Sequence, residues 1–354
     1  MQPKMLHQPP VTLILESCHD LNSSSGRSYL AEDTRWVRVR TVNMEIDTSI
    51  TAPVSDLLDL CRESPSLRVM NVQNIRLRPG TSTRAKSVGR HVESLNVVQY
   101  IRNIHNLGQD YAALLELISS MPNLRRLRLN SYRRYGRDES PSQDSAEQSH
   151  EHIIRNIHEK HQWPQFVKFT CYQQFYEWHS LLKDAHSSLK KLSLLGFWTY
   201  ECIEPLVRAA QDISFKALLD VQIHSQSRRE AQLWTQFVAT LPRLRRLTMY
   251  GYTSFPSDDV SDGTFQILVL SGLCSPLRTL ELACERGDRE HCSELWNLAN
   301  QIQFNRILSR LQKMVVYLEN NEATGSDLVD QYRDYLDAVC TKRRISLTII
   351  WGAN

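Results

Sequence analysis

The sequence predicts an α/β fold, a solenoid with a curved parallel sheet on its concave side and helices on its convex side. The first observation is a recurring phrase, Leu-basic-basic-Leu-x-Leu, whose clearest copies begin at Leu124, Leu189 and Leu244. The second is a helical periodicity in the segments that precede these copies. A phrase that returns every few tens of residues is typical of stacked repeats, in which each unit contacts only its neighbours.

Each copy has the form L-x-x-L-x-L, with other apolar residues allowed, and its L-x-L part alternates as a half-buried strand does. Full copies are anchored at Leu67, Leu95, Leu124, Leu189, Leu218, Leu244, Leu277 and Leu311. The copy at Leu95 is assigned as Leu95-Val98-Tyr100. Weaker copies are expected at Phe166-Phe169-Cys171 and Trp36-Val39-Thr41, and a last strand over Ser346–Trp351.

Helices are expected before most of these strands. Apolar residues recur at i, i+3 and i+4 within 57–61, 112–118, 178–182, 233–238 and 295–302, which indicates amphipathic helices. Prolines such as Pro122 and Pro242 follow several of them and are expected to end the helix. Strands that alternate with helices of this length imply a parallel sheet.

The expected organisation has an N-terminal capping strand and loop over residues 1–34, and an irregular repeat region over 35–354. Segments 10–16 and 35–46 are interpreted as strands because of their apolar alternation. Residues 131–150 are rich in Ser, Asp, Glu, Gln and Arg and almost lack apolar residues. Such a segment cannot bury enough surface to order itself, so it is predicted to be a disordered insertion.

Composition narrows the function classes. The 354 residues include 42 Lys+Arg and 39 Asp+Glu, a net charge of +3, which is too balanced to imply nucleic-acid binding through bulk charge. The eight cysteines are scattered without a C-x-x-C pair, as expected of thiols in a reducing compartment. With no signal-peptide core and no apolar stretch of membrane-spanning length, we expect a cytoplasmic or nuclear protein without membrane contact.

No catalytic or metal-binding signature is found. The sequence has no phosphate-binding glycine loop, no G-x-S-x-G elbow and no recognisable nucleophile constellation, so we expect no enzyme activity, no catalytic residue and no cofactor. The histidines of segment 150–161, the pair Cys284 and Cys292 with His291, and the aspartates of segment 258–262 lack the spacing of known zinc or calcium sites. No metal site is predicted.

The L-x-x-L-x-L core resembles that of the leucine-rich repeat family, although the Asn or Cys that usually follows is mostly missing. Irregular long units with Pro-x-Leu-basic-x-Leu phrases, from Trp36 to Trp351, are most similar to the repeat region of fungal and plant F-box proteins. This resemblance implies a non-catalytic protein-binding module and, by extension, substrate recognition for an SCF-type ubiquitin ligase. Residues Met1 to Asp56 carry no F-box motif, so a ligase adaptor is a partner only if an F-box is supplied elsewhere.

The side chains between the buried residues of each strand are expected on the concave face, where a protein partner would bind. The candidate residues are Arg126, Arg128, Asn130, Lys191, Ser193, Arg246, Thr248, Tyr250 and Tyr317. Arg and Tyr are enriched at interface hot spots, and the basic character favours an acidic or polar protein segment. Two alternatives stay open: that these positions are simply solvated, and that the chain is an RNA-binding repeat protein using the basic strand residues. Nucleic acid is the less favoured partner, because only one residue of each basic pair faces inward.

Overall fold

The computed structural model describes residues 11–15, 39–45, 51–78, 89–101, 107–133, 163–172, 181–182, 184–196, 200–212, 215–224, 228–250, 276–284, 298–300, 302–303, 308–319 and 326–352. The chain divides into two compact units. Unit 1 comprises Met1–Phe166 and Ser180–Ala185, and unit 2 comprises Val167–His179 and His186–Asn354. Among the described helices, none is both long and apolar enough to cross a membrane.

Unit 1 contains a parallel sheet with helices between some of its strands. Its strands lie in the order β1 (Val11–Leu15), β2 (Val39–Glu45), β4 (Val69–Arg78), β5 (Ser94–Ile101) and β6 (Arg126–Arg133), with the short β3 (Thr51–Pro53) beside β4. Helix α3 (Val54–Glu63) precedes β4, and helix α4 (Leu107–Ser119) precedes β6. The strands expected within 10–16 and 35–46 are therefore confirmed as β1 and β2.

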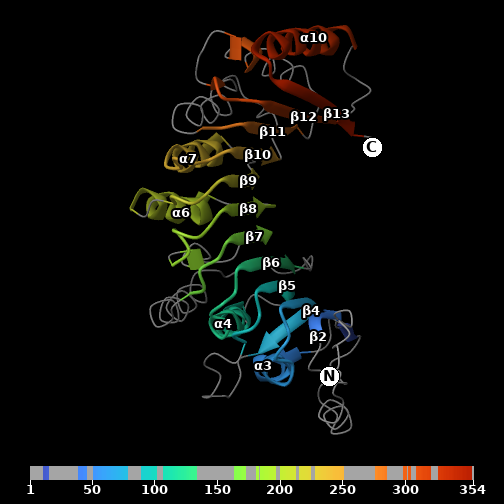
Figure 1. Ribbon diagram of the computed structural model, residues 1–354, viewed down its shortest axis with the longest axis vertical. Coiled ribbons are helices and arrows are strands. Elements are labelled where there is room, and N and C mark those ends of the chain that lie inside the picture. Colours follow the sequence, from blue (N-terminus) through green and yellow to red (C-terminus); the bar gives the residue numbers. More distant parts are fainter. Residues whose placement is uncertain are drawn as a thin grey trace, which may run out of the picture. The chain divides into compact units, whose positions relative to one another are not determined.

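Unit 2 repeats this plan with seven described strands, each paired in parallel with the next. They are β7 (Lys168–Tyr172), β8 (Lys191–Leu195), β9 (Asp220–His224), β10 (Arg246–Tyr250), β11 (Thr279–Cys284), β12 (Lys313–Glu319) and β13 (Ser346–Gly352). Helices α6 (Tyr200–Asp212) and α7 (Arg228–Ala239) lie side by side on the same side of the strands, and α10 (Ser326–Arg343) packs near β13 (Figure 1). The predicted α/β class, with a parallel sheet and helices on one side of it, is confirmed.

The apolar positions of the phrase form the core. Leu192, Val221, Leu247, Leu280 and Met314 occupy one register across five consecutive strands, and all are fully buried. Burial of each such side chain contributes about 1.5–3 kcal/mol relative to exposure. Each strand therefore contributes one apolar side chain of the phrase to a continuous buried layer. This layer determines which face of the sheet meets the helices.

Two expected copies of the phrase are shifted by three residues. Leu95 pairs with Met70 and Leu127, so it fills the second apolar position, and the copy is Val92-Leu95-Val97 rather than Leu95-Val98-Tyr100. In β2 the residue that pairs with Met70 is Val42, so that copy is Val39-Val42-Met44 rather than Trp36-Val39-Thr41. In both segments apolar residues recur every three positions, so the sequence permits more than one assignment of the copy. Pairing with the neighbouring strand selects one of these assignments.

A repeated main-chain junction joins each strand to the one before it. The carbonyl of Val167 accepts hydrogen bonds from the N–H groups of Lys190 (2.9 Å) and Lys191 (3.1 Å). In the next junctions the carbonyls of Lys190, Leu219, Arg245 and Arg278 likewise each accept two hydrogen bonds, at N···O distances of 2.8–3.1 Å. The accepting residue always follows the first apolar residue of the phrase. Only main-chain groups take part, so the junction accepts any side chain at this position.

The prolines of the phrase lie in a turn that follows the end of a helix. Helix α4 ends at Ser119, and the N–H of Leu124 then donates to the carbonyl of Met121 at 3.0 Å. Pro122 is the second residue of this four-residue turn, a position that suits its fixed φ. Pro242 holds the equivalent place after α7, which ends at Ala239. Both helices end before these prolines, as expected, and the prolines also take a defined place in the turn that follows.

The remaining expectations have mixed outcomes. Helices α3, α4 and α7 confirm those expected at 57–61, 112–118 and 233–238, and residues 298–300 and 302–303 are helical within the expected 295–302. At 178–182 the described residues Leu181 and Leu182 adopt 3₁₀-helical conformation, and residues 178–180 lie outside the described part of the chain. Strand β6 continues through Arg133, so the insertion expected at 131–150 overlaps a strand at its start, and residues 134–150 lie outside the described part of the chain.

Replacing Arg344 by glycine is expected to raise the free energy of unfolding by about 1 kcal/mol. Arg344 follows α10 with φ of 60°, in the left-handed region that favours glycine. The N–H of Ile345 donates to the carbonyl of Cys340 (2.8 Å) and that of Arg344 to the carbonyl of Thr341 (3.1 Å), the pattern of a Schellman motif. Urea denaturation followed by circular dichroism measures the change.

The matched control is Lys342→Gly, two residues earlier and inside α10. There glycine should lower the free energy of unfolding by about 0.5–1 kcal/mol, because it loosens a regular helix. If both variants lose stability by similar amounts, Arg344 does not occupy a left-handed cap.

Candidate functional site

The side of strands β7–β13 that faces away from α6 and α7, which we call the strand face, carries three rows of side chains. The register aligns them across the seven strands of unit 2. The start row is Lys168, Lys191, Asp220, Arg246, Thr279, Lys313 and Ser346. The middle row, two residues further along, is Thr170, Ser193, Gln222, Thr248, Glu281, Val315 and Thr348. The end row is Tyr172, Leu195, His224, Tyr250, Ala283, Tyr317 and Ile350.

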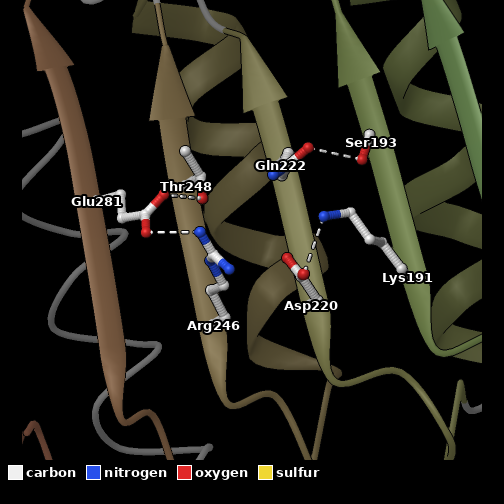
Figure 2. A network of polar contacts seen from close by, with 7 residues as sticks. All are labelled: Lys191, Ser193, Asp220, Gln222, Arg246, Thr248 and Glu281. Atoms are coloured by element: carbon white, nitrogen blue, oxygen red, sulfur yellow. Dashed lines mark hydrogen bonds and ion pairs between the residues drawn. The ribbon is translucent and has the colours of Figure 1, made fainter. Parts of the chain in front are cut away.

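Two cations of the start row form ion pairs, one with an acid of the same row and one with an acid of the middle row. Lys191 Nζ lies 3.1 Å from Asp220 Oδ2 on the neighbouring strand, and Arg246 Nη2 lies 2.7 Å from Glu281 Oε1 (Figure 2). The Arg246 side chain stays 45% exposed, whereas that of Glu281 is 8% exposed. The carboxylates therefore hold two of the predicted binding residues in fixed orientations while part of the guanidinium still faces solvent.

Most of the middle row is buried, although Thr348 on β13 is exposed, and its members from β8 to β11 form hydrogen-bonded pairs. Ser193 Oγ donates to Gln222 Oε1 at 2.8 Å, and Thr248 Oγ1 donates to Glu281 Oε2 at 3.1 Å (Figure 2). Ser193 and Thr248 are each only 1% exposed. These two candidate residues do lie on the expected face, but their burial leaves almost no surface for a partner to touch. In this structure they support the residues around them.

The end row is uncharged and partly exposed. Tyr317 and Ile350 pair across β12 and β13 and are 37% and 40% exposed, which makes them the exposed large apolar residues of the described chain. Burial raises the pKa of Tyr250, and the nearby Glu281, Tyr317 and Tyr172 raise this pKa further, while Arg246 opposes them. Tyr250 therefore stays neutral at physiological pH and contributes a hydroxyl and an aromatic ring.

His224 anchors the end of β9. Its Nδ1 lies 2.7 Å from the carbonyl oxygen of Gly196, which only accepts, so Nδ1 carries the proton and donates. Gly196 has φ of 91°, a conformation that favours glycine. The carbonyl of His224 accepts a hydrogen bond from Trp234 Nε1 of α7 at 3.2 Å. The end row is thus tied through β9 to the helix behind it.

The other three candidate residues belong to unit 1. Arg126 and Arg128 on β6 are exposed and Asn130 is half-buried. The register aligns Arg128 with Asn96, Asn71 and Asn43, and Asn71 Nδ2 donates to Asn43 Oδ1 at 2.7 Å. Lys191, Ser193, Arg246, Thr248, Tyr250 and Tyr317 share the strand face of unit 2. The candidate residues therefore fall into two groups, one in each unit.

The sequence interpretation emphasised the second basic residue of each phrase and passed over the first. Lys190, Arg245 and Arg278 are exposed, and none has an ion pair or a side-chain hydrogen bond within the described part of the chain. The sequence contains a signal that the second basic residue is paired and the first is not. Asp220 and Glu281 lie at strand-face positions of the following repeats, within reach of Lys191 and Arg246.

Thiol and metal chemistry finds little support among the described residues. Cys61, Cys171 and Cys340 are buried free thiols. Burial raises the pKa of Cys61 to about 12, and burial together with Asp337 raises that of Cys340 to about 11, so both stay protonated and poorly nucleophilic at neutral pH. The described residues contain no group of three or more His, Cys, Asp or Glu side chains placed to hold a metal ion. The histidines of 150–161, and His291 with Cys292, lie outside the described residues.

Comparison of the chain with models of known protein families and with the sequences of curated proteins gives no match.

Proposed function

We propose that the chain is a non-catalytic interaction module that binds an extended protein segment on the strand face of unit 2. The observation that carries this proposal is the separation of chemistry along the strands. Exposed cations, Lys313 and part of Arg246, lie in the start row, and exposed aromatic and aliphatic groups lie in the end row. Between them lie the buried middle-row residues Ser193, Thr248 and Glu281, of which Ser193 and Thr248 donate hydrogen bonds within the row.

The spacing of the rows specifies the bound segment. Start and end rows are four residues apart along each strand, which corresponds to about 13 Å at the usual strand rise. An extended peptide that lies along a strand therefore matches the surface if it has an acidic residue and an aromatic or aliphatic residue four positions apart, in either order. The acid would face Arg246 or Lys313, and the apolar residue would pack against Tyr250, Tyr317 or Ile350.

The ion pair between Arg246 and Glu281 favours binding of a peptide to the strand face. Arg246 is held by Glu281, so little side-chain freedom is lost when its exposed N–H groups meet a carboxylate. Tyr side chains bury a large area with only two rotatable bonds, which is one reason for their enrichment at hot spots. The oriented guanidinium of Arg246 in the start row, together with Tyr250 and Tyr317 in the end row, supports recognition of a segment with mixed acidic and apolar character.

The resemblance of the repeats to F-box proteins extends the proposal to a class of partner. In that extension the bound segment belongs to a ubiquitin-ligase substrate in the cytoplasm or nucleus, and an F-box supplied elsewhere provides the ligase adaptor.

A peptide-display selection on the full chain tests the proposal. From a random library of peptides about 12 residues long, in the size range of linear recognition motifs, we expect enrichment of an Asp or Glu four residues from an aromatic or aliphatic residue. Enriched peptides should bind the double variant Lys313→Gln/Tyr317→Ala at least about tenfold more weakly by fluorescence anisotropy, since a hot-spot truncation costs about 1–2 kcal/mol or more.

The matched control is Lys342→Gln/Tyr335→Ala, which makes the same chemical changes on α10. It should bind the selected peptides as the wild-type chain does. Selection of peptides without the acidic-apolar spacing, or equal loss in both double variants, would show that the strand face is not the binding surface.

A further inference from the structure

We infer that unit 2 carries a second interaction surface, along the edge where its strands start, which binds the phosphodiester backbone of nucleic acid. We call this surface the basic ridge. It consists of Lys190, Lys216, Arg243, Arg245, Arg278 and Arg310, all of which are exposed. It goes beyond the proposed peptide-binding function, because its residues are distinct from the three rows of the strand face.

The ridge is an ordered array because its main chain is part of the repeated junction. The carbonyl of Lys190 accepts from Leu219, that of Leu219 from Arg245, and that of Arg245 from Arg278 at 2.8 Å. Successive strands are about 4.8 Å apart, so the distance from β8 to β12 is about 19 Å. Within this span the six cations lie on one edge of one sheet.

The described acids do not compensate the charge of the ridge cations. The second residue of each basic pair is neutralised across the sheet, Lys191 by Asp220 and Arg246 by Glu281. None of the six ridge residues has an ion pair or a side-chain hydrogen bond in the described part of the chain. With respect to the described residues, the ridge therefore presents unshared positive charge.

Arg245 and Arg278 show most clearly how positive charges of the ridge lie next to each other. They immediately precede the neighbouring strands β10 and β11, and the N–H of Arg278 donates directly to the carbonyl of Arg245. Like charges at neighbouring positions of a sheet are destabilising, and neither arginine has an ion pair with a described carboxylate. An anion placed between the two guanidinium groups would remove this repulsion. Two arginines side by side are well suited to the two free oxygens of one phosphodiester group.

The chemistry of the ridge favours phosphate over a protein partner. Protein interfaces depend on buried aromatic and apolar anchors, and the exposed residues between the ridge cations, such as Pro242, Ser309 and Gln312, include no aromatic group. Binding of a nucleic-acid backbone needs only correctly placed cations. The whole-chain charge of +3 hides this surface, because acids on other elements balance the total.

The test is a fluorescence-anisotropy titration of the full chain with a labelled oligouridylate and with a DNA duplex, each about 20 nucleotides or base pairs long, enough to cover the ridge. With six contacts on the single strand, a plot of log affinity against log salt should have a slope of about −4. The variant Lys190→Gln/Arg245→Gln/Arg278→Gln should make this slope shallower by about 2 and weaken binding on the order of tenfold at low salt. The oligouridylate and duplex arms show which form of nucleic acid is preferred.

The matched control is Arg208→Gln/Arg333→Gln/Lys342→Gln, which removes the same charge from helices α6 and α10. It should keep the wild-type affinity and slope for the oligonucleotide. Absence of binding by the wild-type chain, equal losses in the two triple variants, or competition by polyglutamate as strong as that by RNA of equal charge would each overturn the inference. The ridge variant leaves Lys313 and Tyr317 intact, so it should still bind the selected acidic peptides. A failure of nucleic-acid binding can therefore be distinguished from a failure of peptide binding.

Discussion

Replacing Trp234 by alanine is expected to lower the free energy of unfolding by about 3–5 kcal/mol, the usual range for a large aromatic residue removed from a core. Trp234 is fully buried, and its ring packs edge-on against Phe237 with 6.1 Å between centroids. Its Nε1 donates to the carbonyl of His224 at 3.2 Å, which links α7 to the end of β9. Urea denaturation monitored by circular dichroism gives the loss directly.

Two further variants separate packing from the hydrogen bond. Trp234→Phe keeps an aromatic ring but leaves the His224 carbonyl without this donor, and should lose about half as much as Trp234→Ala. Gln236→Ala, an exposed position on the same helix, should change the free energy by less than about 0.5 kcal/mol. If Trp234→Ala proves no more disruptive than Gln236→Ala, α7 does not pack on the sheet as described.

The second large effect is expected at the buried carboxylate. Replacing Arg246 by methionine should lower the free energy of unfolding by about 2–3 kcal/mol, because Glu281 stays buried and keeps only the hydrogen bond from Thr248. The loss should be smaller than for a fully buried ion pair, since the Arg246 side chain is half-exposed. Thermal or urea denaturation near neutral pH measures it.

A double variant tests the cause. Arg246→Met/Glu281→Leu removes both charges and should recover most of the loss, because apolar replacement of a buried pair is often neutral. Lys313→Met, two strands away in the same row and without a described ion pair, should be within about 0.5 kcal/mol of the wild-type chain. Equal stability of Arg246→Met and Lys313→Met would mean that the pair with Glu281 contributes nothing.

Much of the fold follows from local sequence. The alternation at Leu247 and Met249 predicts a strand whose leucine side faces the core, and the spacing of Leu233, Phe237 and Val238 predicts the helix behind it. These patterns repeat in nearly every unit, so the parallel sheet and its accompanying helices follow with them. Local patterns failed where apolar residues recur every three positions, as around Val92 and Leu95, because only pairing with β4 and β6 selects the register.

The candidate surface was predicted less completely, for a related reason. Alternation correctly places Lys191 and Arg246 on the strand face, but it does not show that Asp220 and Glu281, 29 and 35 residues later, neutralise them. It also does not show that Ser193 and Thr248 are covered by their neighbours. Partners on the next strand determine exposure and charge, and their identity depends on the register rather than on the residue itself.

The junction between successive strands has a consequence for how such a chain can change. Because one carbonyl and two N–H groups form each junction, the alignment of strands does not depend on how many residues lie between two phrases. First apolar positions are 23 residues apart from Phe166 to Leu189 and 34 apart from Leu277 to Leu311, yet β7–β8 and β11–β12 pair in the same register. Segments between phrases can therefore lengthen or shorten in evolution, or accept an engineered graft, while the strands on either side keep their alignment.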